Sequence, residues 1–105
     1  MRRFEIWLVT LDPAQGSEMR KPRPAVVVSP DEMNVRLNTV LVAPLTKHGF
    51  AAPFRVPCQF AGVVGQIALD HLRSVDKRRL ARKLGELDQS TAKTMLAILR
   101  EVFEE

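Results

Sequence analysis

Cysteine, tyrosine and long apolar runs are scarce or missing from this 105-residue chain, which has one cysteine and no tyrosine. No apolar stretch approaches the ~20 residues that a membrane-spanning helix needs. The lone Cys58 cannot form an internal disulfide, which favours a reducing compartment. One cysteine and two histidines are too few for a dedicated zinc site. We therefore expect a cytoplasmic protein with no membrane association, no metal and no cofactor.

Familiar catalytic and nucleotide-binding motifs are also missing. The chain has no Gly-rich phosphate loop, no Gly-x-Ser-x-Gly turn and no closely spaced cysteine pair. Its N-terminal sequence MRRFEIWLVTLDP lacks the apolar core and cleavage site of a signal peptide. Its aromatic residues are Trp7 and five phenylalanines, so platforms for stacking nucleobases are scarce.

Basic residues are only slightly in excess, with 16 Lys and Arg against 12 Asp and Glu, but they are clustered. Arg20, Lys21 and Arg23 form one cluster, and positions 73–83 hold six basic residues against one acid. Such clusters are typical of a surface that binds an anionic partner such as nucleic acid. A solvated surface without a partner is the alternative reading.

The distribution of apolar and turn residues predicts a mainly β protein with helices, in one domain over residues 1–105. Short apolar or β-branched segments, separated by Pro and Gly, predict strands, with helical turns at 30–34 (capped by Ser29) and 77–82. Apolar residues at helical spacing predict an amphipathic helix over Asp88–Phe103, with Asp88 as its N-cap. The stripe comprises Ala92, Met95, Leu96, Leu99, Val102 and Phe103. The expected strands are 4–11, 24–29, 38–46, 53–58, 66–75 and 83–87, of which 53–58 is expected at a sheet edge because of its prolines.

The stretch Lys21-Pro22-Arg23-Pro24 places an arginine between two prolines, at the start of an apolar strand. Proline restricts its own backbone and that of the residue before it, so Arg23 is held on a stiffened segment. The loop before it, about Asp12 to Pro22, is long for so small a domain, which is typical of a functional loop. Other polar candidates near strand ends and loops are Glu18, Thr46, Asp70, His71 and Arg73.

Three stretches, EIWLVTLDPAQGSEMRKPRPAVVVSP, VLVAPLT and LDHLRSVDKRRL, resemble the MazF/PemK/Kid family of toxins from toxin–antitoxin pairs. The resemblance covers nearly the whole chain. It implies a metal-independent ribonuclease on an SH3-like barrel of about five to seven strands with a C-terminal amphipathic helix. It also implies single-stranded RNA as substrate, a homodimer, and neutralisation by an antitoxin with an acidic tail.

The resemblance assigns catalytic positions to Arg23 and Thr46. A forked, permanently charged guanidinium suits the negative charge that builds on a phosphate during RNA cleavage, and a threonine hydroxyl can donate to the same group. A surface ion pair for Arg23 and a capping role for Thr46 are the structural alternatives. Six further residues are expected to face RNA: Glu18, Arg20, Lys21, Arg73, Lys77 and Arg78.

Asp70 and His71 are the further catalytic candidates. The family usually has Asp-Gln at these positions, and in its Kid-like branch the Asp is a proposed base that works with an Arg and a His. Those two partner positions are Ala68 and Ser17 here, so that mechanism does not transfer whole. His71 can carry a proton near neutral pH, and a structural role for it stays open.

Two competing functions remain at this stage. A gyrase-poisoning toxin of the same fold would act through a Trp-Gly-Ile-type C-terminus, whereas this chain ends Val-Phe-Glu-Glu. A silent RNA-binding relative is the other, and the presence of Arg23 and Thr46 argues against it.

A homodimer is also expected because the strand 4–11 is apolar on both faces, with Ile6 on one side and Trp7 and Val9 on the other.

Overall fold

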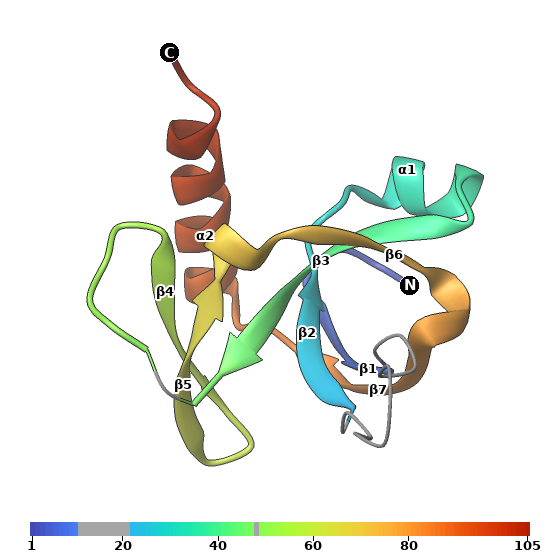
Figure 1. Cartoon of the computed structure of the whole chain (residues 1–105), viewed down its shortest axis with the longest axis horizontal. Helices are drawn as coiled ribbons and strands as arrows, with labels where there is room; N and C mark the ends of the chain where they lie inside the picture. The colour runs from blue at the N-terminus through green and yellow to red at the C-terminus, as the bar shows by residue number, and fades with distance from the viewer. Residues whose placement is uncertain (11–21, 48) are drawn as a thin grey trace, which may run out of the picture.

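The computed structural model describes residues 1–10, 22–47 and 49–105, and shows one curled seven-stranded sheet with two helices (Figure 1). The strand order is β4-β5-β3-β2-β1-β7, and β6 pairs with β3 as well. The helices are α1 (Asp31–Arg36) and α2 (Gln89–Val102), with short 3-10 turns η1 (Leu69–His71) and η2 (Lys77–Arg79). The strands are β1 (Glu5–Val9), β2 (Arg23–Val27), β3 (Thr39–Thr46), β4 (Arg55–Phe60), β5 (Val63–Ala68), β6 (Arg73–Asp76) and β7 (Leu80–Glu86).

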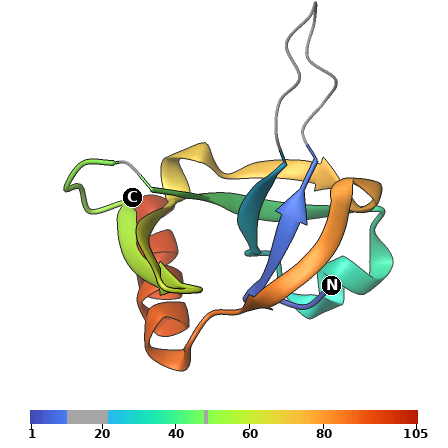
Figure 2. The ribbon, with the colours of Figure 1, turned by 90° about the horizontal axis from the view of Figure 1, so that it is seen from below.

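Two cores lie on opposite faces of the central strands. Successive residues of β2 alternate between them, with Val26 in one core and Val27 in the other. The first core also contains residues of β4, β5 and α2, and the second is enclosed by β1, β2, β3, β6 and β7. This architecture confirms the predicted fold class, in the form of a half-open barrel closed on one side by α2 (Figure 2).

The predicted C-terminal helix is confirmed, including its cap. Asp88 is the N-cap of α2. Its backbone is extended, and its side chain accepts a hydrogen bond from the Thr91 N–H. Met95 is fully buried against the first core, where Ile98 also packs. The last turn of the predicted stripe is not covered, because α2 projects past the sheet and leaves Val102 50% and Phe103 74% exposed (Figure 1).

The predicted strand over 66–75 is wrong, because the chain changes partner within it. β5 pairs with the end of β3 near Thr46, whereas β6 pairs with the beginning of β3 from Thr39. The turn η1 makes the change of direction between these two pairings. Asp70 and His71 therefore lie at a corner of the sheet and not along a strand.

The helical turn after β2 is confirmed as α1, but the prediction that Ser29 caps it is wrong. The residue before α1 is Pro30, which has no side-chain hydrogen bond to the helix. The buried Ser29 hydroxyl instead accepts from the Leu41 N–H and donates to Asn34. Ser29 thus ties α1 to β3, which a cap would not do. The predicted turn at 77–82 is also shorter, since η2 ends at Arg79 and β7 begins at Leu80.

Both faces of β1 contribute to a core within one copy of the chain. Ile6 is fully buried in the first core, Val9 is buried in the second, and Trp7 packs against that second core. Trp7 and Leu8 are only partly buried, which leaves apolar surface on this strand for the expected homodimer contact. The position of β4 at the sheet edge, expected from its prolines, is confirmed. None of the helices in the described part of the chain is long and apolar enough to cross a membrane.

Glu5 is a buried carboxylate at the start of β1, only 7% exposed. Its carboxylate accepts hydrogen bonds from the Arg2 N–H at 2.9 Å and the Trp7 indole at 3.0 Å, and pairs with Lys83 at 3.0 Å. Burial alone would raise the pKa of Glu5, but these three donors outweigh it and lower the pKa from 4.5 to about 2. The carboxylate therefore links the N-terminus, β1 and β7 as an ionised group.

We expect Glu5→Gln to lower the free energy of unfolding at neutral pH by on the order of 2 kcal/mol. Because the folded state lowers this pKa, the contribution of Glu5 is complete above about pH 4.5 and is lost as the pH falls toward 2. Urea unfolding of the wild type and of Glu5→Gln should show that the difference in their free energies of unfolding shrinks as the pH falls from about 4.5 toward 2. Glu86→Gln is the matched control, since Glu86 also pairs with Lys83 but its side chain is 64% exposed. A difference between Glu5→Gln and wild type that stays constant with pH would contradict the assignment.

Candidate active site

A cleft of about 440 Å³ opens where β2 begins and β3 ends, beside η1 and the segment that leads into β4. Its lining includes three of the predicted catalytic residues, Arg23, Thr46 and His71. The register of the central strands brings the first two together: Ala25 pairs with Pro44, and continuing this register by two residues puts Arg23 opposite Thr46. Residues that are 23 positions apart in the sequence thus share one rim of the sheet.

Thr46 is held in place by close packing of β5. The residue is opposite Gln66 in the pairing of β3 with β5. A Cβ atom at the neighbouring Gly65 would lie 2.5 Å from the Thr46 carbonyl oxygen, so only glycine fits without displacing the end of β3. The position of Thr46 beside the cleft therefore depends on a glycine in the adjacent strand.

Arg55 is a second arginine in the cleft lining, and sequence reasoning missed it. Its Nε donates to Asp70 Oδ1 at 2.7 Å and its Nη2 donates to Oδ2 at 2.9 Å. Arg55 begins β4 and pairs with Ala68, which places its guanidinium beside the η1 turn that carries Asp70. The signal in the sequence was weak: a single charged residue within the otherwise apolar segment Phe54-Arg55-Val56.

The ion pair with Arg55 keeps the Asp70 carboxylate ionised. The hydrogen bond from Arg55 holds the pKa of Asp70 below its ordinary value of 3.8 and in turn raises the pKa of Arg55. Both carboxylate oxygens accept from the guanidinium, and the Arg55 side chain is only 8% exposed. An ionised carboxylate engaged in this way suits a positioning role better than proton transfer.

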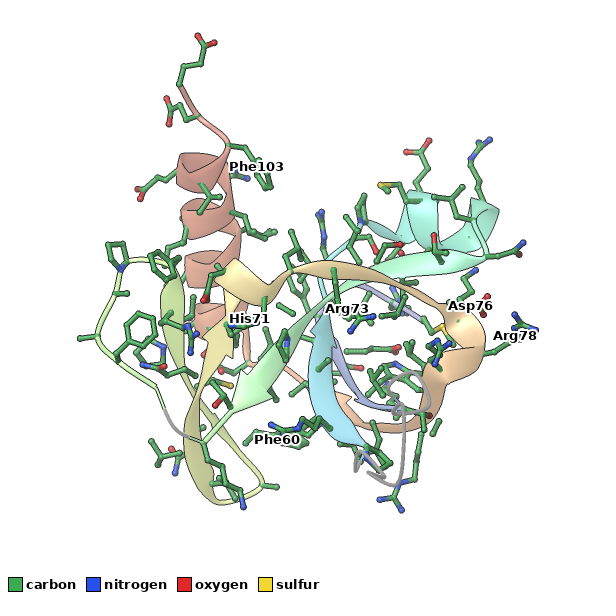
Figure 3. All side chains as sticks on the ribbon, viewed as in Figure 1. Phe60, His71, Arg73, Asp76, Arg78 and Phe103 are labelled. Atoms are coloured by element: carbon green, nitrogen blue, oxygen red, sulfur yellow. The ribbon has the colours of Figure 1, made fainter. Side chains whose placement is uncertain are left out.

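His71 follows Asp70 in η1 (Figure 3), and it lines the same cleft as Arg23 and Thr46. Its Nε2 lies 3.4 Å from Asp70 Oδ2, and its side chain is 63% exposed. The imidazole is thus within reach of an orienting carboxylate and open to a ligand in the cleft. Histidine is the side chain that exchanges protons near neutral pH, and this placement suits such a role.

The residues predicted to bind RNA are not all gathered at this cleft. Asp76 and Arg78 lie across the molecule from His71 (Figure 3), and Arg78 donates to Asp76 at 3.1 Å. Lys77 shares the η2 turn with Arg78, and Arg73 lies on β6 opposite Val42. Glu18, Arg20 and Lys21 lie outside the described residues.

Carboxylates, thiols and imidazoles do not converge on a metal site in residues 1–10, 22–47 and 49–105. No group of three such side chains is placed there to hold an ion.

A half-open barrel with a cationic cleft at the rim of its central strands defines a small β protein suited to binding an anionic ligand. Residues 2–103 match the model of the PemK-like, MazF-like toxins of type II toxin–antitoxin systems. The chain belongs to this family, which confirms the resemblance seen in the sequence.

Individual relatives support the same assignment. The chain is 39% identical over 97 residues to the endoribonuclease MazF9 of Mycobacterium tuberculosis, a match that covers 83% of this chain and 82% of the relative. It is 38% identical over 109 residues to the endoribonuclease toxin ChpB of Escherichia coli, covering 97% and 93% of the two chains. A solved MazE–MazF complex from Deinococcus radiodurans is similar with a TM-score of 0.83 and 28% identity, covering 97% of this chain and 94% of that one.

Proposed function

We propose that this chain, as one domain over residues 1–105, is a sequence-selective endoribonuclease toxin that cleaves single-stranded RNA, including mRNA, without a metal ion. The observation that carries the proposal is the shared cleft of Arg23, Thr46 and His71 in a chain of this family. The toxin acts in the cytoplasm and slows growth when it is free of its antitoxin.

The reaction is a transesterification at one phosphodiester. The 2′-oxygen attacks the neighbouring phosphorus while its proton passes to a base, for which His71 is the candidate in the cleft. The bond from phosphorus to the 5′-oxygen then breaks, and that oxygen takes up a proton. The products are a 2′,3′-cyclic phosphate and a 5′-hydroxyl, and no oxidant or further reactant is needed.

Arg23 and Thr46 stabilise the charge that develops during this step. The Arg23 guanidinium donates to the non-bridging oxygens, and the Thr46 hydroxyl donates to the same phosphate. Donors that are already in position lower the barrier most, because little reorganisation is left when charge develops. Pro24 and the pairing of β1 with β2, in which Val9 is opposite Arg23, supply that rigidity.

The test is to map the ends of cleavage products on a long RNA in the presence of EDTA. We expect cuts at a restricted set of sequences, with 2′,3′-cyclic phosphate and 5′-hydroxyl ends. Cleavage that EDTA alone abolishes would contradict the metal-independent mechanism. RNA binding without any cleavage would identify the chain as a silent binding relative.

We also propose that an antitoxin with an acidic tail neutralises this chain, and that the toxin is a homodimer. The D. radiodurans relative was solved as a complex with MazE. In this chain, the basic cluster over residues 73–83 carries the charge opposite to that of an acidic tail. Light scattering tests the dimer, and a monomer mass at micromolar concentration would contradict it.

Reversing the charge of Lys77, Arg78 and Arg82 to Glu should slow association with the antitoxin's acidic tail more than it speeds dissociation. Exposed charges mainly steer encounter, and salt screens them beyond about 8–10 Å at physiological ionic strength. Stopped-flow binding of the tail as a synthetic peptide, at low and high salt, measures both rates. The matched control is Arg36→Glu on α1. Binding that is indifferent to salt, or an association rate unchanged by the three reversals, would contradict this proposal.

A further inference from the structure

Phe50 is an exposed aromatic residue in the lining of the active cleft, together with Arg23, Thr46 and Arg55. It lies in the segment between β3 and β4. The residue is 53% exposed, although a phenylalanine of a protein core would be covered. Single exposed apolar residues are common on protein surfaces, so the contacts that Phe50 makes decide what it can do.

Three contacts hold Phe50 in place. The Arg55 guanidinium lies over the ring, 4.6 Å from its centroid. The Phe54 ring meets it at 76°, with centroids 6.1 Å apart. The Gln66 amide nitrogen donates to the Phe50 backbone carbonyl at 3.0 Å. An exposed ring anchored through both its backbone and its side chain is a preformed surface and not a loose loop tip.

Arg55 itself is fixed from the other side. Asp70 binds it through two hydrogen bonds, so the guanidinium supports the Phe50 ring in one orientation. The stack Asp70–Arg55–Phe50 therefore extends from the η1 corner of the cleft to its rim. One face of the ring rests on a cation, and more than half of the residue remains accessible to a flat ligand.

We propose that Phe50 is a stacking platform for one nucleobase of the RNA next to the scissile phosphate. This inference rests on the proposed function and adds a base-binding subsite to it. Single-stranded RNA is read by splaying out its bases and stacking them on aromatic side chains or arginines. Phe50 offers such a face in the same cleft as the phosphate-directed Arg23 and Thr46. Stacking on a ring tolerates every base, so this subsite fixes the register of the strand and leaves sequence choice to other contacts.

The test uses a 2′-O-methyl oligoribonucleotide that spans the mapped cleavage site and cannot be cut, because its 2′-oxygens are blocked. Phe50→Leu keeps an apolar side chain but removes the flat ring, and should weaken binding by roughly 5- to 100-fold. Phe50→Trp, which restores a larger flat surface, should bind at least as tightly as wild type. Phe103→Leu is the matched control, since Phe103 is 74% exposed at the end of α2 (Figure 3), and its affinity should equal that of wild type.

An abasic scan of the same oligonucleotide identifies the stacked base. Removing one base should weaken binding to wild type, and the same removal should cost Phe50→Leu nothing further, because the two partners of one contact are not additive. If no position shows this coupling, or if Phe103→Leu weakens binding as much, the stacking proposal is overturned. Wild-type protein that neither binds nor cuts RNA overturns both proposals, whereas wild-type cleavage with unchanged affinity in Phe50→Leu overturns only this one.

Discussion

Arg23→Ala should lower the rate of RNA cleavage by roughly 10²–10³-fold, which is the usual loss for one preorganised donor to a transition state. The loss is expected in the chemical step, because the guanidinium meets most of its negative charge only as the phosphorus becomes five-coordinate. Single-turnover cleavage of a labelled RNA at saturating protein measures that step directly.

Two further variants decide whether the position of the charge matters. Arg23→Lys should also be impaired, since a lysine keeps the charge but cannot present a fork of donors. Arg36→Ala removes an exposed arginine from the last turn of α1, and should cleave like wild type. Wild-type rates in Arg23→Ala would show that Arg23 is not the stabilising cation, and Arg55 would then be the other arginine that the described residues contribute to the cleft lining.

Arg23 and Thr46 could be predicted from the sequence because the relevant information is local. Arg23 begins the apolar strand β2 and Thr46 ends the apolar strand β3. These two strands are neighbours that pair antiparallel. Strand ends, prolines and the resemblance to a family were therefore enough to place both residues at one rim of the sheet.

Arg55 could not be predicted in the same way, because its role depends on a register. The pairing of Arg55 with Ala68 is set by the hairpin between β4 and β5, and a shift of one residue would point the side chain to the other face. The partner Asp70 was expected on a continuous strand, and the η1 turn that brings it to Arg55 comes from the change of pairing between the two halves of β3. Phe50 was missed for a related reason: its contacts come from β4 and β5, and not from its own segment.

The position of His71 in the cleft depends on the η1 turn between β5 and β6. As part of one long strand it would share a face with Ile67 and Arg73, whereas η1 places it on the cleft wall, next to the carboxylate of Asp70. Asp70 is itself held by Arg55, so it can orient the imidazole without accepting its proton. Arg55, which holds the Asp70 carboxylate, thus lines the same cleft as the imidazole of His71 and the side chain of Arg23.

His71→Gln should lower cleavage by on the order of 10²-fold, the lower range for loss of a general acid–base group. Glutamine keeps the size and polarity of the side chain but cannot take up a proton, so the proton transfer proposed for this position should be lost. Single-turnover cleavage at saturating protein measures the effect.

Chemical rescue separates a catalytic imidazole from a structural one. The His71 side chain is 63% exposed in an open cleft, so free imidazole can reach the space left in His71→Ala. We expect added imidazole to restore part of the activity of His71→Ala and none of the activity of Arg23→Ala, whose missing group is a fixed cation and not a proton carrier. Full activity in His71→Gln would show that His71 has no catalytic role.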